Sequence, residues 1–237
     1  MKNSISILLL GLFTYCGFSQ QYEIEYNHIT TFDAHTTEAI YKLAYANQKS
    51  TYFQLKSEFI ESLGNDVMVA NEGVIPFVEK DYSKKRVVYN QPIVNKIVFI
   101  EDQLPMQKWK ITNESKKIKD FNCRKATTSF RGRAYTAWFT EDIPIINGPW
   151  KFDGLPGLIL EVVSSDGVLN IEAVKIEKTS HVTTPIFKYK EDALMAWEDY
   201  CQNYRKVIDR IQKNMMADTD PDVEYNITLN LVEDIGL

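Results

Sequence analysis

The sequence predicts an α+β protein that is mainly β: a curved antiparallel meander sheet, half-barrel-like, with one long C-terminal amphipathic helix packed against it. Three observations predict this fold class. Apolar and polar residues alternate over most of the chain, short polar turns join the alternating runs, and only residues 191–215 repeat apolar residues every three or four positions. No linker, repeat or low-complexity stretch divides the remainder, so we expect one domain over residues 20–237.

The first predicted strand alternates strictly with polar residues and carries Tyr22, Ile24, Tyr26 and His28. Further runs of this kind lie at 39–45, 51–55, 85–89, 97–100, 109–112, 123–130, 134–140, 158–163, 169–176 and 223–231. Such runs, joined by short polar turns, are typical of an antiparallel meander. The clearest hairpin is Arg131-Gly132-Arg133, where one glycine separates two strand-like runs.

The helical segment places its apolar residues on one face: Leu194, Trp197, Cys201, Tyr204, Ile208 and Ile211. Acidic residues at its start, Glu191, Asp192 and Glu198, favour the positive end of the helix dipole. An amphipathic helix needs an apolar surface to cover, and the concave face of the sheet is the natural one.

The N-terminus is typical of a secretory signal. Lys2 precedes an apolar run at 5–13, and the small residues Gly17 and Ser19 favour cleavage after Ser19. The run is shorter than the about 20 apolar residues of a membrane span. We therefore expect residues 1–19 to be removed, the mature chain to have no transmembrane segment, and the protein to be periplasmic or secreted.

The formal net charge is −5, which gives no indication of nucleic-acid binding. Charge is unevenly placed, because residues 108–133 hold nine basic residues against two acidic ones. This stretch is either an ordinary solvated face or a basic surface for an anionic partner. Cys123 and Cys201 remain after export, and the sequence does not tell whether they form a disulfide.

Catalytic and metal-binding patterns are sparse. The three histidines lie in separate segments, no serine sits in a Gly-x-Ser-x-Gly turn, and there is no Cys-x-x-Cys or phosphate-binding glycine loop. We expect no metal, no cofactor and no catalytic residue of the nucleophile–histidine type. Carboxylate pairs such as Glu141 with Asp153 could serve acid–base chemistry, although acidic residues at strand ends and turns are more often structural.

The most distinctive stretch is 148–161, which places three glycines and two prolines within residues 148–157 and then enters an apolar run. We assign a structural role in this motif, a turn leading into a strand, to Gly148, Pro149, Gly154, Leu155, Pro156, Gly157, Leu158 and Ile159. These residues and the segment 109–161 around them resemble the GLPGLI family of secreted Bacteroidetes proteins. That resemblance implies export but no particular reaction.

The aromatic residues of this region leave two interpretations open. They could plug the core beneath a long connection, or they could form the rim of an apolar ligand site or a partner-docking surface. The leading hypothesis is a non-enzymatic envelope carrier for a lipid or lipopeptide. A curved sheet with one helix is similar, at the level of fold alone, to periplasmic lipoprotein carriers. The residues expected to bind are Trp109, Trp138, Trp150 and Phe152, with Arg131 and Arg133 for an anionic end.

Two alternatives stay open beside the carrier. One is a docking module that binds an outer-membrane transport or secretion component through residues 141–157. The other is a carboxylate-based hydrolase. The balance of the sequence leans against an enzyme.

Overall fold

The computed structural model describes residues 21–33, 35–59, 75–217 and 229–236. One twelve-stranded sheet dominates it, in the order β12-β6-β5-β4-β3-β2-β1-β11-β10-β9-β8-β7. Neighbouring strands pair antiparallel, except that β12 runs parallel to β6. The predicted class, mainly β with one long C-terminal helix, is confirmed.

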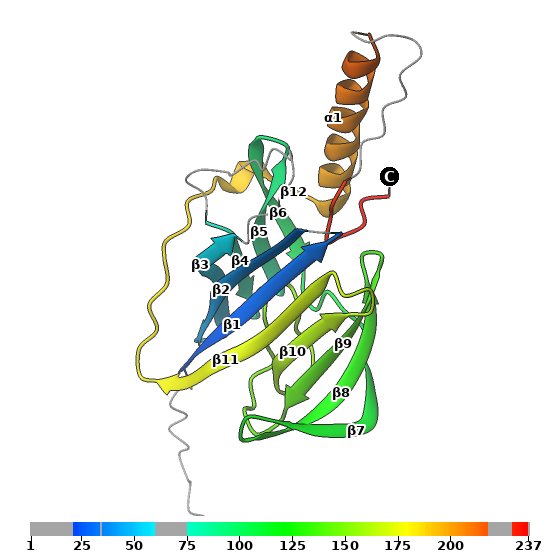
Figure 1. The fold of residues 1–237 in the computed structure, drawn as a ribbon. Coiled ribbons are helices and arrows are strands. Elements are labelled where there is room, and N and C mark those ends of the chain that lie inside the picture. Colours follow the sequence, from blue (N-terminus) through cyan, green and yellow to red (C-terminus); the bar gives the residue numbers. More distant parts are fainter. Residues whose placement is uncertain (1–20, 34, 60–74, 218–228, 237) are drawn as a thin grey trace, which may run out of the picture.

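Two consecutive meanders build the sheet. The first contains β1 (Gln21–Phe32), β2 (His35–Ala46), β3 (Lys49–Phe59), β4 (Phe77–Asp81), β5 (Arg86–Ile93) and β6 (Lys96–Gln103). The second contains β7 (Lys110–Ile118), β8 (Phe121–Phe130), β9 (Arg133–Thr140), β10 (Leu158–Ser164) and β11 (Leu169–Thr179). Because β11 pairs with β1, the meanders join into one curved open sheet (Figure 1).

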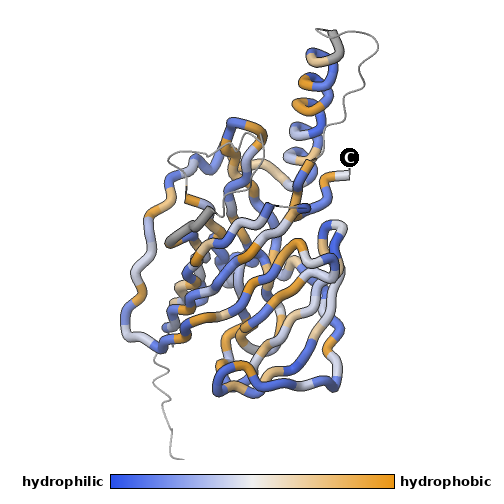
Figure 2. Tube along the Cα trace, viewed as in Figure 1, coloured by the Kyte–Doolittle hydropathy of each residue, from blue (hydrophilic) through white to orange (hydrophobic). Residues whose placement is uncertain are grey.

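Alternation along the strands sets the inner face of the sheet. In β1, Tyr22, Ile24 and Tyr26 are buried while the residues between them are only half-buried. The same alternation of apolar and polar residues can be followed along other strands in Figure 2. The inward side chains form one large core cluster inside the curve.

Part of the outer face is covered as well. Tyr52 and Phe53 are neighbours in β3 and point to opposite faces, yet both are buried. Phe53 belongs to a second cluster with Ala44 and Phe77, on which Phe187 stacks at a ring distance of 4.0 Å. Phe187 lies in the extended chain between β11 and η1 (Glu191–Ala193), so this connection covers that part of the outer face.

The helix α1 (Trp197–Ala217) follows the short strand β12 (Leu194–Met195) and rises from one rim of the sheet (Figure 1). Its buried positions are Tyr200, Cys201, Tyr204 and Ile208, all on the predicted apolar face. The Tyr200 hydroxyl donates to the Pro92 carbonyl at 3.0 Å, which ties the first turns to the end of β5. No helix in the described part of the chain is long and apolar enough to cross a membrane.

Three details differ from the sequence prediction. Leu194 belongs to β12 instead of the helix. The strand β4 was missed, because only five residues form it and one of them is a buried lysine, Lys80. The predicted closing strand 223–231 lies mostly outside the described residues, and residues 229–231 form no strand. Cys123 and Cys201 are both buried free thiols.

Candidate functional site

The loop between β9 and β10 contains the distinctive glycine–proline stretch, and it is packed into the core. The Phe152 ring is fully buried and contacts the rings of Trp150, Tyr135 and Trp109 at centroid distances of 5.4, 4.9 and 6.1 Å. The Trp109 indole N–H donates to the Asp153 carbonyl at 2.6 Å. These aromatic residues therefore plug the interior, which is the first of the two interpretations left open by the sequence.

The glycines of this loop are needed for close packing. A Cβ on Gly157 would lie 2.1 Å from the Thr140 carbonyl oxygen, and its φ of +153° is one that other residues rarely adopt. A Cβ on Gly148 would lie 2.8 Å from the Ile159 side chain. Leu155, Leu158 and Ile159 are buried, so the Gly154–Ile159 hexamer is a packing element.

The buried lysine Lys80, which the sequence analysis did not identify, is hydrogen-bonded to the β9–β10 loop. The Lys80 ammonium donates to the Phe152 carbonyl at 2.7 Å, the Gly148 carbonyl at 3.2 Å and Asn147 Oδ1 at 3.3 Å. Burial lowers the pKa of Lys80 to about 8, against the opposing charge of Asp153. The alternation of inward and outward side chains along β4 could have placed Lys80 on the same inner face as Val78. No pattern of neighbouring residues, however, indicates which groups Lys80 binds.

A central charge cluster lies between the sheet, the loop and the C-terminal segment, and consists of Asp102, Arg131, Lys151 and Glu233. Glu233 accepts hydrogen bonds from Arg131 Nη1 at 2.6 Å and from the Lys151 ammonium. Arg131 Nη2 also donates to Asp102 Oδ2 at 2.6 Å. Two cations thus face two carboxylates, and the cluster is neutral as a whole.

Aromatic rings enclose the two cations. The Arg131 guanidinium lies 3.6 Å from the Trp197 ring centroid, and the Lys151 ammonium lies 3.8 Å from that of Tyr89. Burial lowers the pKa of Lys151 to about 8, although Glu233 acts in the opposite direction. Burial also opposes the charge of Arg131, but Glu233, Tyr89 and Asp102 outweigh it and raise its pKa.

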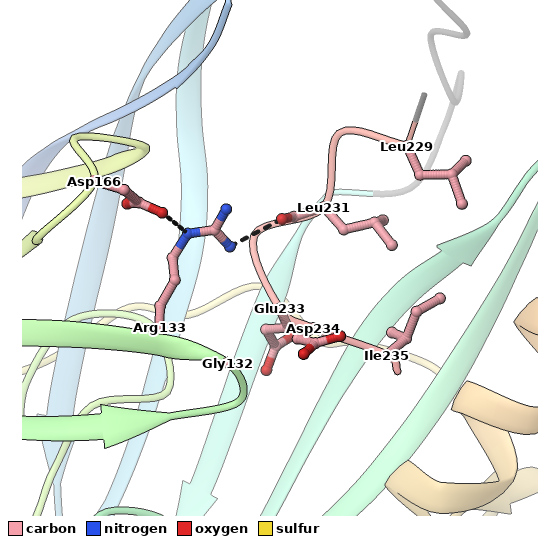
Figure 3. Close-up of a pocket in the computed structure, with 8 residues that line it drawn as sticks. All are labelled: Gly132, Arg133, Asp166, Leu229, Leu231, Glu233, Asp234 and Ile235. Atoms are coloured by element: carbon pink, nitrogen blue, oxygen red, sulfur yellow. Dashed lines mark hydrogen bonds and ion pairs between the residues drawn. The ribbon is translucent and has the colours of Figure 1, made fainter. Parts of the chain in front are cut away.

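Beside this cluster lies a cleft of about 300 Å³, which we call the Arg133 cleft. Its lining residues are Gly132, Arg133, Asp166, Leu229, Leu231, Glu233, Asp234 and Ile235 (Figure 3). Arg133 Nε donates to Asp166 at 2.7 Å, and its Nη1 donates to the carbonyls of Leu231 and Val232. The cleft therefore has Arg133 and Asp166 on its sheet side, and both apolar residues and the carboxylates of Glu233 and Asp234 on the side of the C-terminal segment.

The structure does not gather the six predicted binding residues into one site. Trp109, Trp150 and Phe152 pack together in or near the core, whereas Trp138 lies half-buried on the opposite face of β9. The Lys116 ammonium covers the Trp138 ring at 4.6 Å and pairs with Glu161. Arg131 and Arg133 bind carboxylates of this same chain. The aromatics thus lie on different faces, and the two arginines are paired within the chain.

Other candidates from the sequence can also be placed. Glu141 is exposed and pairs with Arg124 at 2.8 Å, whereas Asp153 is buried, so this carboxylate pair does not share an environment. Burial raises the pKa of Asp153, while Lys80 and the Met106 backbone N–H oppose that shift. Within the described ranges, no three or more His, Cys, Asp or Glu side chains gather as a metal site would require.

Comparison with known proteins gives the family. A family model described as "N-glycanase peptide, N-terminal domain" matches residues 77–199, just over half of the chain. The matched segment includes the Arg131–Arg133 hairpin and the whole β9–β10 loop. A comparison with curated proteins found no match.

Two solved structures of PNGF-II are also similar. The one in space group C2 has 24% sequence identity and a TM-score of 0.48, over 70% of this chain and 29% of that chain. The one in space group P21 has 23% identity and a TM-score of 0.45, over 75% of this chain and 31% of that chain. This chain therefore corresponds to less than a third of the length of those proteins.

These findings correct two expectations. The assignment to the GLPGLI family is wrong, since the matching model is that of the N-glycanase domain. In the structure, Gly157 of the hexamer meets a packing demand of the turn. The carrier and docking hypotheses are wrong as well, because the matching family model is that of an N-glycanase domain. By the match over residues 77–199, this chain belongs to the family described as N-glycanase peptide, N-terminal domain.

Proposed function

We propose that the protein binds carbohydrate, specifically N-glycans or glycan-bearing polypeptide, and that its own role is binding instead of bond cleavage. The observation that carries this proposal is the match to the N-terminal domain of N-glycanases. The matched residues include Gly132, Arg133 and Asp166, which form the sheet side of the Arg133 cleft. The C-terminal segment supplies the other side.

The chemistry of the Arg133 cleft suits a saccharide. Sugar hydroxyls both donate and accept hydrogen bonds, and the cleft offers the carboxylates of Asp166 and Asp234 with the guanidinium of Arg133. The C–H faces of a sugar ring are apolar and would lie against Leu229 and Leu231. The volume of the cleft, about 300 Å³, is at the lower end for small-molecule sites, and a short stretch of glycan would fit it.

The state of the carboxylates supports binding over cleavage. Carboxylate-based hydrolysis of a glycoside needs two acidic groups facing one substrate, one to transfer a proton and one to act as base or nucleophile. In the cleft, Glu233 is buried and bonded to Arg131, Lys151 and Gln91, and Asp166 is bonded to Arg133. Burial would raise the pKa of Asp166, but hydrogen bonds from Ser164, the Val168 backbone N–H and Arg133 lower it. Both oxygens of Glu233 are engaged by Arg131 and Lys151.

We further propose that the protein acts outside the cytoplasm as one domain over residues 20–237. The support is the secretory pattern of residues 1–19, which lie outside the described residues. An intact mass of the exported protein equal to that of the chain starting at Gln20 would support it. A mass that retains residues 1–19 would contradict it.

Titration of the purified full protein with an isolated N-glycan core oligosaccharide, followed by amide NMR, tests the binding function. We expect shifts at residues 131–133, 166 and 229–235, and at least about tenfold weaker binding in Asp166→Asn and Asp234→Asn. The matched control is Glu177→Gln, an exposed acid-to-amide change in an ion pair outside the cleft. Unchanged spectra at millimolar glycan would overturn the proposal, and glycan release from a glycoprotein would overturn its non-catalytic part.

A further inference from the structure

A second polar site lies in the interior, beneath the β9–β10 loop and away from the Arg133 cleft. Four buried side-chain atoms lie there: Asn147 Nδ2 and Asp153 Oδ1 have no hydrogen-bond partner among the described residues, and the hydroxyls of Ser50 and Tyr82 have none besides each other. Ser50, Asn147 and Asp153 are 3%, 0% and 1% exposed. Buried polar groups are nearly always satisfied in folded proteins, so these four together require an explanation.

The fold brings these atoms to one place. Ser50 on β3 is directly opposite Lys80 on β4, and both side chains point inward beside the core residues Tyr52 and Val78. Tyr82 begins the turn after β4 and packs against the core cluster, with its ring centroid 6.4 Å from that of Tyr45. Its hydroxyl is hydrogen-bonded to that of Ser50 and feels the charge of Asp153.

Lys80 joins the loop side of the site to the sheet side. Its ammonium donates to Asn147 Oδ1 at 3.3 Å, so the free amide nitrogen of Asn147 lies next to it. Lys80 and Asp153 also interact electrostatically. Ser50 and Asn147 thus neighbour Lys80, and Asp153 interacts with both Lys80 and Tyr82.

The hydrogen-bonding capacities of the four atoms are complementary to water. Asp153 Oδ1 only accepts, Asn147 Nδ2 only donates, and the hydroxyls of Ser50 and Tyr82 can do both. A water molecule donates two and accepts two hydrogen bonds, and buried water typically makes about three. A metal ion fits less well, because the site has a single carboxylate and an ammonium group already beside it.

We propose that this interior site binds at least one water molecule as a fixed part of the fold, bridging Asp153 to Tyr82, Ser50 and Asn147. The bridge connects β3 and β4 to the loop at residues 147–153. The bound water also supplies Asp153, which interacts electrostatically with Lys80, with a hydrogen bond that the apolar core cannot supply. The inference is independent of the proposed glycan binding.

Replacement of Tyr82 by phenylalanine tests the proposal through the sign of its effect. If the hydroxyl bonds to bound water, Tyr82→Phe breaks that bond and raises the unfolding equilibrium constant by about tenfold. If the hydroxyl is truly unsatisfied, the change removes a buried polar atom and leaves stability unchanged or increased. The reference is Tyr26→Phe, which loses a buried hydrogen bond of 2.8 Å to the Ile159 carbonyl.

Two further measurements keep the test decisive. Ser50→Ala should destabilise in the same direction as Tyr82→Phe, and the double variant should cost less than the sum because the two hydroxyls also bond to each other, so the transfer from water described next is what identifies the bridge. NMR magnetisation transfer from long-lived water should reach the amides of residues 147–153. Neutral or stabilising effects of both single variants, or no transfer from water to this loop, would overturn the proposal.

Discussion

Replacing Glu233 by alanine gives the sharpest test of how the C-terminal segment is held. Glu233 is 5% exposed and balances two cations, Lys151 with 0% and Arg131 with 10% of the side chain exposed. After its removal, Arg131 keeps its ion pair with Asp102, whereas Lys151 loses its ion pair with Glu233. An uncompensated buried charge typically costs about 3–5 kcal/mol.

We therefore expect Glu233→Ala to lower the free energy of unfolding by about 3–5 kcal/mol, which is a large part of the about 5–15 kcal/mol that stabilises a typical domain. Urea denaturation followed by tryptophan fluorescence measures this, because Trp197 stacks on Arg131 at the cluster. The control is Glu141→Ala, which breaks an exposed ion pair with Arg124 and should cost less than about 1 kcal/mol.

A second variant separates lost charge from lost packing. Replacing both Lys151 and Glu233 by leucine removes the ion pair without leaving a lone buried charge, and should cost less than Glu233→Ala alone. A cost for Glu233→Ala no greater than that of Glu141→Ala would refute the reasoning, since Glu233 would then not be buried against these cations in solution.

Three further predictions concern the loop and the buried titratable groups. Gly157→Ala should lower the free energy of unfolding by at least about 3 kcal/mol, because the added Cβ would overlap the Thr140 carbonyl. The control Gly167→Ala, which has open space around its Cβ, should cost about 1–2 kcal/mol, and equal costs in urea denaturation would contradict the packing role of Gly157. Stability should rise between pH 8 and about 10, because Lys80 and Lys151 have pKa values of about 8 in the folded protein and 10.5 in the unfolded chain, which therefore binds more protons in this range. A stability that does not change with pH in this range would contradict the burial of the two lysines. Stability should fall from pH 6.5 to pH 4, because burial lowers the pKa of His28 to about 4 and the unfolded histidine takes up a proton first. His28→Gln should reduce the dependence of stability on pH in this range, and an unchanged slope in that variant would contradict the role of His28.

The arginines of the β8–β9 hairpin show how far a local reading extends. The sequence marked Arg131 and Arg133 as groups that bind an anion, and both do bind carboxylates. The carboxylates belong to Asp102, Glu233 and Asp166 of the same chain. Partners up to about a hundred residues away along the sequence are invisible to a pattern of neighbouring residues, so the anion was assigned to an external ligand.

The sequence by itself determined ten of the twelve strands of the described residues, the hairpin and the helix. Alternation, turn residues and helical spacing act over a few neighbours, and they placed ten of the strand runs and the apolar face of α1 correctly. They did not decide how strands distant in sequence join, which is why β11 closing on β1 emerged only in the structure.

Tertiary structure alone decided what the distinctive loop does. From the sequence, Trp150 and Phe152 suited an exposed rim as well as a core plug, because an aromatic ring is apolar in either place. The hydrogen bond from Lys80 to the Phe152 carbonyl and that from Lys151 to Glu233 hold the loop in the interior, and they span 72 and 82 residues of sequence. Such long-range contacts depend on the packing of the whole sheet, and no local pattern encodes them.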